Sequence, residues 1–121
     1  MARVVHFEIP AADPDDAVAF YQKVFGWQIS KWEGPQDYWI IKTGEPEEAG
    51  IDGAITRKEN LAATTNTVDV ASVDESSQKV MEAGGKIVVP KTAVPGVGYM
   101  VYCADLDDNV FGMMQADPSA H

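Results

Sequence analysis

The sequence predicts an α+β domain made of two βαβββ modules, because the same order of elements occurs twice. Each half of the chain contains one capped helical segment, with an alternating strand before it and three strands after it. The glycines that end the two helices, Gly26 and Gly85, lie 59 residues apart. Gly53 and Gly112, in the last strand of each half, have the same separation. A repeat this long indicates duplication of a unit that cannot bury its own sheet face alone. We therefore divide the single domain into module one (1–57), a linker (58–64) and module two (65–121).

The first module begins with an alternating strand, VVHFEIP, which carries His6 and Glu8 on one face and mostly apolar side chains on the other. Asp13 is suited to cap the helix that follows, because the next residue is a proline. The helical spacing predicts a buried stripe of Ala17, Phe20, Tyr21 and Val24. Three strands are then expected, in WQISKW (27–32), DYWIIKT (37–43) and GIDGAITR (50–57).

The second module repeats this order. We expect a strand over 65–70 and then a helix that begins at a capping box formed by Ser72 and Glu75. Two consecutive glycines end this helix. The three strands that complete the module are expected in KIVVPK (86–91), GYMVYCA (98–104) and NVFGMMQ (109–115).

The composition is that of a globular protein and narrows the range of partners. A hydrophobic content of 45% is enough for a core. The formal charge of −10, with no large cluster of Lys or Arg, argues against nucleic acids and anionic membranes as partners. Because no apolar run approaches the ~18 residues of a membrane span and the start lacks a signal-peptide pattern, we expect a cytoplasmic protein. The single cysteine, Cys103, lies in an apolar strand pattern, so we expect a buried, unreactive thiol.

Three stretches of the chain together form a recognisable pattern. They are the first-strand His6 followed by DPDDAVAFYQKVFGW, then VDESSQKVMEAGGKIVVP, and the closing CADLDDNVFGMMQ. Over essentially its whole length the chain resembles the vicinal oxygen chelate superfamily, which contains glyoxalase I, bleomycin-resistance proteins, fosfomycin-resistance enzymes and extradiol dioxygenases. The resemblance implies that the modules form an eight-stranded open cup, the glyoxalase/bleomycin resistance/dihydroxybiphenyl dioxygenase fold. It also implies a homodimer.

The resemblance bears on metal binding, because the metal enzymes of this superfamily draw ligands from the first and last strands of each module. Carried onto this chain, the first-strand positions are His6 and Thr65, and the last-strand positions fall on or beside Gly53 and Gly112. Only His6 is a family-type ligand. A protein-bound transition metal normally needs about three imidazole, thiolate or carboxylate ligands. We therefore expect no metal cofactor. The alternative is a divalent metal such as Zn, Ni, Mn or Fe, held by His6, Glu8 and Asp69.

The expected function is to hold a small, partly apolar molecule in the cup, by analogy with bleomycin-resistance proteins. The negative charge suits a cationic or neutral ligand. Alternatively the chain is a lyase, isomerase or dioxygenase of the same superfamily, in which His6 and Glu8 are catalytic as an acid–base pair or His6 binds a metal. The alternation leaves open which face of the aromatic strands points inward. The candidate ligand-binding residues are Gly53, Thr65, Thr67, Tyr99 and Gly112.

Overall fold

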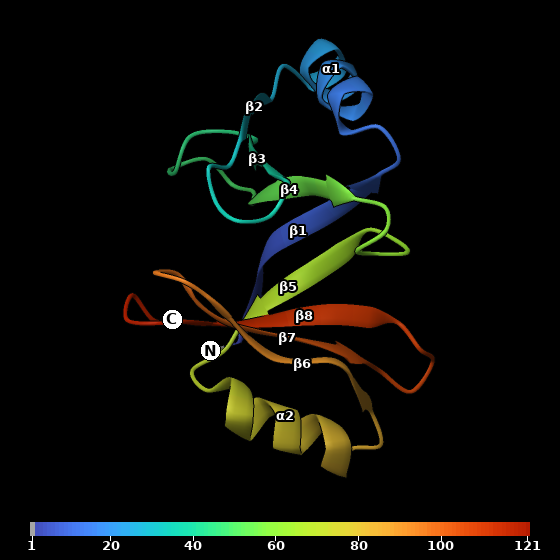
Figure 1. Ribbon diagram of the computed structural model, residues 1–121, viewed down its shortest axis with the longest axis vertical. Coiled ribbons are helices and arrows are strands. Elements are labelled where there is room, and N and C mark those ends of the chain that lie inside the picture. The colour runs from blue at the N-terminus through green and yellow to red at the C-terminus, as the bar shows by residue number, and fades with distance from the viewer. Residues whose placement is uncertain (1) are drawn as a thin grey trace. The chain divides into compact units, whose positions relative to one another are not determined.

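The computed structural model describes residues 2–121, and within them it contains eight strands and two helices (Figure 1). In chain order the elements are β1 (Arg3–Ala11), α1 (Pro14–Phe25), β2 (Gln28–Lys31), β3 (Tyr38–Lys42), β4 (Asp52–Arg57), β5 (Thr65–Asp69), α2 (Val73–Glu82), β6 (Lys86–Val94), β7 (Gly98–Ala104) and β8 (Val110–Ala116). Both predicted helices and all eight predicted strands are confirmed, with shifts of a few residues at the ends of some strands.

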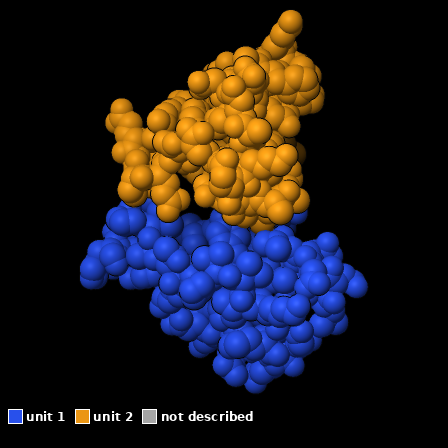
Figure 2. Space-filling model, turned by 45° about the vertical axis from the view of Figure 1, so that its right-hand side comes forward, with its two compact units in different colours: residues 1–5, 66–121 blue, residues 6–65 orange. Residues whose placement is uncertain are grey.

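The chain divides into two compact units, which are coloured separately in Figure 2. We call residues 6–65 the N-terminal unit. Residues 66–121, together with the start of the chain through Val5, form the C-terminal unit. Each unit is described by itself below.

In the N-terminal unit the strand order is β2-β3-β4-β1. β2, β3 and β4 pair antiparallel, whereas β1 and β4 run parallel, because α1 lies between β1 and β2 in the sequence and reverses the direction of the chain. Asp13 caps α1 by accepting a hydrogen bond from the backbone of Asp16 at 3.2 Å. Gly26 ends the helix in the left-handed region at φ 71° and donates its N–H to the Gln22 carbonyl.

The face of this sheet that packs against α1 carries the apolar core of the unit. Trp39, Ile41 and Ile55 are buried there together with Ala11. Residues of α1 that pack against this cluster are Ala17, Val18 and Tyr21. The predicted stripe was therefore wrong in two members: Phe20 and Val24 are 58% and 52% exposed. The helix presents its 14, 17, 18 and 21 positions to the sheet, a stripe rotated away from the one that the apolar spacing indicated.

In the C-terminal unit the strand order is β5-β8-β7-β6, with β5 and β8 parallel and the other pairs antiparallel. The Ser72 hydroxyl caps α2 by accepting a hydrogen bond from the backbone of Glu75 at 3.1 Å. The core against α2 contains Val101, Cys103 and Met113. Cys103 is fully buried, as expected, and this burial raises the pKa of its thiol.

The two units thus have the same internal arrangement, which confirms the α+β class and the paired βαβββ organisation. Their cores also settle which face of each strand packs against a helix. In β3 the helix-packed residues are Trp39 and Ile41, so Tyr38 and Ile40 lie on the opposite face. In β7 the helix-packed residues include Val101 and Cys103, so Met100 and Tyr102 lie on the opposite face. The face opposite the helix carries most of the candidate site residues, whereas Gly53 and Tyr99 lie on the helix-packed face.

Candidate functional site

His6 and Tyr38 form the central polar contact on the open face of the N-terminal sheet. The Nε2 atom of His6, on β1, lies 2.6 Å from the hydroxyl oxygen of Tyr38, on β3, although 32 residues separate the two in the sequence. Their rings are nearly parallel, with an interplanar angle of 18° and 6.3 Å between the centroids. In the neutral imidazole, Nε2 accepts from the phenol or donates to it according to the tautomer. The Tyr38 hydroxyl can therefore accept a hydrogen bond from a ligand in one tautomer of His6 and donate one to it in the other.

Burial lowers the pKa of His6 below its ordinary value of 6.5. The nearby carboxylates of Glu8 and Asp52 act in the opposite direction, because negative charge favours the protonated ring, but their effect is smaller. His6 is therefore a neutral imidazole at pH 7. A neutral ring can act as a base or as a hydrogen-bonding group without carrying a charge into the site.

The ring of Trp32 lies beside this pair. It stands edge-on to Tyr38, with 6.0 Å between the ring centroids and an interplanar angle of 73°, and the Trp32 backbone N–H donates to the Tyr38 carbonyl at 2.7 Å. Gly34 allows this position: a Cβ atom added there would come within 2.1 to 2.3 Å of three carbons of the indole. The loop between β2 and β3 is thus folded so that Trp32 packs on Gly34 and Tyr38.

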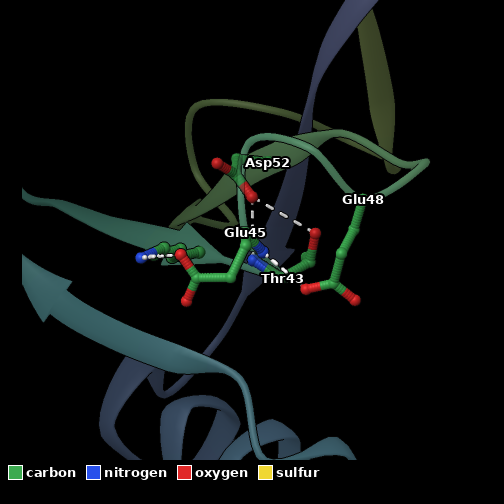
Figure 3. A network of polar contacts seen from close by, with 5 residues as sticks. Thr43, Glu45, Glu48 and Asp52 are labelled. Carbon is green, nitrogen blue, oxygen red and sulfur yellow. Dashed lines mark hydrogen bonds and ion pairs between the residues drawn. The ribbon is translucent and has the colours of Figure 1, made fainter.

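Two acidic residues lie close to His6 on neighbouring positions of the sheet. Glu8 follows it on the same face of β1 and is only 5% exposed. Asp52 is the residue of β4 that pairs with His6. Its carboxylate accepts hydrogen bonds from Thr43, at 2.8 Å from the backbone N–H and 3.2 Å from the hydroxyl (Figure 3). Asp52 therefore holds the loop between β3 and β4, while its charge still acts on His6.

The same loop carries further polar contacts, which are also drawn in Figure 3. Glu45 donates its backbone N–H to a carboxylate oxygen of Glu48 at 2.8 Å and forms an ion pair with Lys42 at 3.4 Å. A shallow depression beside this network is lined by Gly26, Gln28, Lys42, Thr43, Gly44 and Glu45. The two charged side chains that line the depression, Lys42 and Glu45, pair with each other. We therefore treat the network as a structural element of the loop.

The side chains at the ligand positions that the resemblance implies do not fit a metal centre. His6 supplies one imidazole, and Gly53 and Gly112 supply no donor. The Thr65 hydroxyl is buried and already donates to the Ala63 carbonyl at 2.9 Å. Asp69, the proposed third ligand of the alternative site, is exposed. Within residues 2–121 no three or more His, Cys, Asp or Glu side chains are grouped so that they could hold a metal ion.

Two of the candidate ligand-binding residues lie on the helix-packed face of their sheets. Gly53 pairs with Phe7, and a Cβ atom added to it would come within 2.6 Å of the Phe7 ring and 2.5 Å of the Phe7 carbonyl oxygen. The glycine thus leaves room for Phe7. Tyr99 packs against the core cluster of the C-terminal unit, and the Lys91 ammonium lies 4.7 Å from its ring centroid. The structure gives both residues a packing role.

Thr67 and Gly112 lie on the opposite face of the C-terminal sheet, where they pair across β5 and β8. The Thr67 side chain is buried, and its hydroxyl oxygen has no hydrogen-bond partner. Met100 and Tyr102 complete this corner, because their side chains approach the space in front of Gly112. Among the candidate ligand-binding residues, Thr67 and Gly112 therefore lie on the face that is not packed against a helix.

Sequence reasoning missed the roles of Trp32, Tyr38 and Asp52. Alternation puts Tyr38 and Ile40 on one face of β3, but it does not decide whether that face packs against the helix. Asp52 had a signal, since it stands directly beside a last-strand ligand position. The sequence gives no signal for Trp32, because its location depends on the path of the loop around Gly34.

No helix within residues 2–121 is long and apolar enough to span a membrane. The cytoplasmic location stays a prediction.

Comparisons with known proteins agree with this architecture. Residues 3–44 match the family model described as bleomycin resistance protein-like N-terminal. The chain is 28% identical over 114 residues to "Putative glyoxylase CFP32" from Mycobacterium bovis, and the same match is found in Mycobacterium tuberculosis. The match covers 92% of this chain and 43% of the relative, so the chain spans less than half the length of these curated relatives.

Solved structures show the fold. A glyoxalase/bleomycin resistance protein/dioxygenase superfamily member from Vibrio splendidus is similar with a TM-score of 0.70 and 18% identity, over 97% of this chain and all of that one. Methylmalonyl-CoA epimerase from Streptomyces coelicolor, solved with 2-nitronate-propionyl-CoA, has a TM-score of 0.70 and 13% identity, over 98% and 97% of the two chains. Both likenesses extend over nearly the whole length and support the open, eight-stranded α+β fold expected from the sequence. The family model over the first third of the chain and the glyoxylase relatives agree with the resemblance to the vicinal oxygen chelate superfamily, and the solved structures show that the chain shares their fold.

Proposed function

We propose that this protein binds a small, partly apolar molecule on the open face of its N-terminal sheet, with the His6–Tyr38 pair as the polar anchor and with no resident metal. The observation that carries the proposal is the 2.6 Å contact between His6 Nε2 and the Tyr38 hydroxyl. In the superfamily's metal enzymes the first-strand residue is a ligand. Here that imidazole is hydrogen-bonded to a phenol, and the other ligand positions hold glycine and threonine.

The surroundings of the pair support a ligand with an apolar body. Trp32 and Tyr38 supply aromatic surface, and Ile40, which follows Tyr38 on the same face, is 42% exposed. Small-molecule sites typically combine such an apolar lining with a few polar groups that fix orientation.

The charge near the pair favours a neutral or cationic ligand. The two charges that act on His6 are both negative, those of Glu8 and Asp52, and His6 itself is neutral at pH 7. The chain as a whole carries −10. An anion would therefore meet an unfavourable potential both at a distance and at close range. A CoA ester, the type of ligand bound in the epimerase structure, is highly anionic, so we propose a different ligand class for this chain.

A matched set of probes tests this proposal. Indole and benzamidine represent neutral and cationic aromatic molecules, and benzoate is the anionic control. We expect chemical-shift changes at the His6 ring on titration with the first two probes and not with benzoate. Tyr38→Phe, which removes only the hydroxyl, should weaken binding about 5-fold, the equivalent of one hydrogen bond of ~1 kcal/mol. Tyr99→Phe is the control, because Tyr99 lies on a helix-packed face. Equal binding by Tyr38→Phe, or preferential binding of benzoate, would contradict the proposal.

A metal-free acid–base isomerase or lyase is the second candidate. The neutral state of His6 and its short contact with Tyr38 favour it, because the pair could take a proton from a bound carbon acid and pass one back. The glyoxylase relatives suggest one substrate to test, the hemithioacetal of methylglyoxal and glutathione. Thioester formation that is lost in His6→Ala would support an enzyme. A dioxygenase is not proposed, because that chemistry needs a metal that the side chains do not fit.

We also propose that the protein is a homodimer. Its curated relatives are more than twice as long as this chain, and the superfamily pairs such units. Apolar side chains of α1, namely Phe20, Val24 and Phe25, are exposed and could be covered by a second copy. Light scattering coupled to size-exclusion chromatography tests this. A mass near 26 kDa, twice the 13.1 kDa of the chain, is expected, and a mass of one chain at all concentrations would contradict the proposal.

A further inference from the structure

We propose that the outward face of α1 binds the same face of α1 in a second copy of the chain, with the two helices antiparallel about a two-fold axis between Ala19 and Phe20. Asp16 of each copy then lies opposite Lys23 of the other. The inference rests on the homodimer proposed above and adds the surface through which the copies meet and the direction of the helices. It uses no residue on the open face of either sheet.

The helix α1 carries apolar side chains on two sides, and the sheet covers only one of them. Ala17, Val18 and Tyr21 pack against the core of the N-terminal unit. Phe20 and Val24 lie four residues apart, so they are neighbours on the helix surface, and they are 58% and 52% exposed. Neighbouring apolar side chains that are exposed together indicate a surface that another molecule covers.

The exposed ring of Phe20 is connected to the core by a series of aromatic contacts. It stands edge-on to Tyr21, with 5.2 Å between the ring centroids and an interplanar angle of 89°. Tyr21 stacks on Trp27 at 5.2 Å and 11°, and Trp27 contacts Phe7 of β1. An aromatic ring that is already supported in this way loses little conformational freedom when a partner covers it, which favours its use in binding.

The charges beside Phe20 indicate which occupant fits this face. Asp16 lies four residues before Phe20 and Lys23 three residues after it, so opposite charges flank the ring along the helix. Both residues are exposed, and within residues 2–121 neither forms an ion pair. Two copies that each carry −10 repel one another in general, so a contact between them needs a place where opposite charges meet. An antiparallel pair of α1 helices provides two such places.

The register of this pairing is also suited to packing. In a two-fold contact each pair of opposing residues occurs twice. If Asp16 lies opposite Lys23, then Phe20 lies opposite Ala19, which is exposed and has a small side chain over which a ring can pack. The same face of the helix thus combines an aromatic centre with charged flanks that are complementary to themselves.

The exposed apolar area limits the strength of the contact. A phenylalanine buries at least about 150 Å² when it is covered, so Phe20 offers roughly 100 Å² in each copy. A stable interface buries about 800 Å² on each partner. The polar side chains of α1 must supply much of the remainder, and we expect a weak dimer that dissociates on dilution.

Sedimentation equilibrium of the full chain over a range of concentrations gives the Kd of the dimer. Phe20→Ala should raise this Kd about tenfold or more, because both copies lose a ring from the centre of the contact. Leu106→Ala is the matched control. Leu106 is 75% exposed and lies between β7 and β8 in the C-terminal unit, so the Kd should not change. Circular dichroism verifies that the variants remain helical.

An exchange of charges tests the antiparallel direction. Asp16→Lys places two lysines opposite each other, and Lys23→Asp places two aspartates opposite each other, so each variant alone should have a Kd about tenfold higher at low salt. An equimolar mixture of these variants restores both attractive pairs and should dimerise like the wild type. Added NaCl should reduce these differences by screening. Glu82→Lys and Lys79→Asp on α2 change the net charge equally and are the controls, for which mixing should have no effect.

The outcomes separate this inference from the homodimer itself. A dimer whose Kd is unchanged in Phe20→Ala, or a mixture of the charge variants that dimerises no better than its components, overturns the α1 contact and leaves the homodimer in place. A chain that is monomeric at all concentrations overturns both proposals.

Discussion

The hydroxyl of Tyr38 reaches across the N-terminal sheet to the Nε2 atom of His6, 2.6 Å away, and the ring of Trp32 packs edge-on against that tyrosine. Three side chains from two strands and a loop thus form one small assembly. Its chemistry is that of a neutral imidazole and a phenol in a partly buried, aromatic setting with negative charge nearby. Five predictions follow from this assembly and from the packing around it.

The stability of the protein should depend on His6 as the pH is lowered through 6.5, the ordinary pKa of a histidine. Burial lowers the pKa of His6 in the folded state, so the unfolded state binds more protons in this range. The free energy of unfolding is therefore highest above pH 6.5 and falls as the pH is lowered towards the folded-state pKa. Urea titrations at several pH values measure it. His6→Gln should flatten the dependence, whereas His121→Gln, an exposed control, should not. A dependence unchanged in His6→Gln would contradict the assignment.

Gly34→Ala should displace Trp32 while leaving the indole in the chain. The added Cβ atom would overlap the ring, which must then move outwards. We expect a red shift of the tryptophan fluorescence and a rise in the pKa of His6 towards 6.5, measured by NMR, because the site becomes more exposed to water. Gly44→Ala is the matched control, since its Cβ atom would meet only the flexible end of Glu48. Identical spectra for the two variants would show that Trp32 is not held by Gly34.

Alanine substitutions at Gly53 and Gly112 should differ in their effects on stability, although these glycines occupy corresponding places in the sequence repeat. At Gly53 the added atom would strike the carbonyl oxygen and ring of Phe7, and a cost of about 2–3 kcal/mol is expected. At Gly112 it would meet a movable methionine methyl and a tyrosine edge at 3.3 Å. We expect less than about 1 kcal/mol there. Urea unfolding of both variants gives the comparison, and equal losses would contradict the assigned faces.

Cys103 should be unreactive in the native protein. It is fully buried in the C-terminal core, and its thiol has a raised pKa, so little thiolate forms and none is accessible. A chromogenic disulfide reagent should modify it only after denaturant is added. The control is the same reaction in denaturant, where one thiol per chain is expected. Rapid modification under native conditions would show that this strand opens.

Divalent transition metals should not stabilise the protein. Elemental analysis of the purified protein and thermal unfolding with Ni²⁺, Zn²⁺, Mn²⁺ or Fe²⁺ test this. We expect no stoichiometric metal and no change in Tm on adding a chelator, because His6 lacks the two further ligands that such ions need. A stoichiometric metal whose affinity collapses in His6→Ala would reverse the proposal.

Local signals in the sequence were sufficient for the elements of the fold. Asp13 and Ser72 mark the starts of the helices, and the left-handed Gly26 marks an end, because unsatisfied backbone groups at helix termini need particular residues. The alternation of the strands follows from the backbone geometry of extended chains. These rules act between neighbours in the sequence, so they can be applied without knowing the fold.

The spacing of apolar residues along α1 was less informative about which side of the helix packs against the sheet. Phe20 and Val24 fit an apolar spacing as well as Ala17 and Tyr21 do, yet only the second pair packs against the sheet. The rotation of a helix about its axis is chosen by the shape of the whole surface below it. A spacing argument cannot weigh that shape, because it counts apolar residues without knowing their partners.

By itself, then, the sequence determined the order of the elements and the duplicated βαβββ pattern, since both depend on residue types at known spacings. The tertiary structure alone decided which side of every strand faces a helix. That choice brought His6 to Tyr38, and it put Gly53 and Gly112 on different faces of their sheets, the first against Phe7 and the second beside Thr67. The physical reason is that alternation has a period of two and treats both faces alike, whereas only the packing of α1 and α2 makes the faces different.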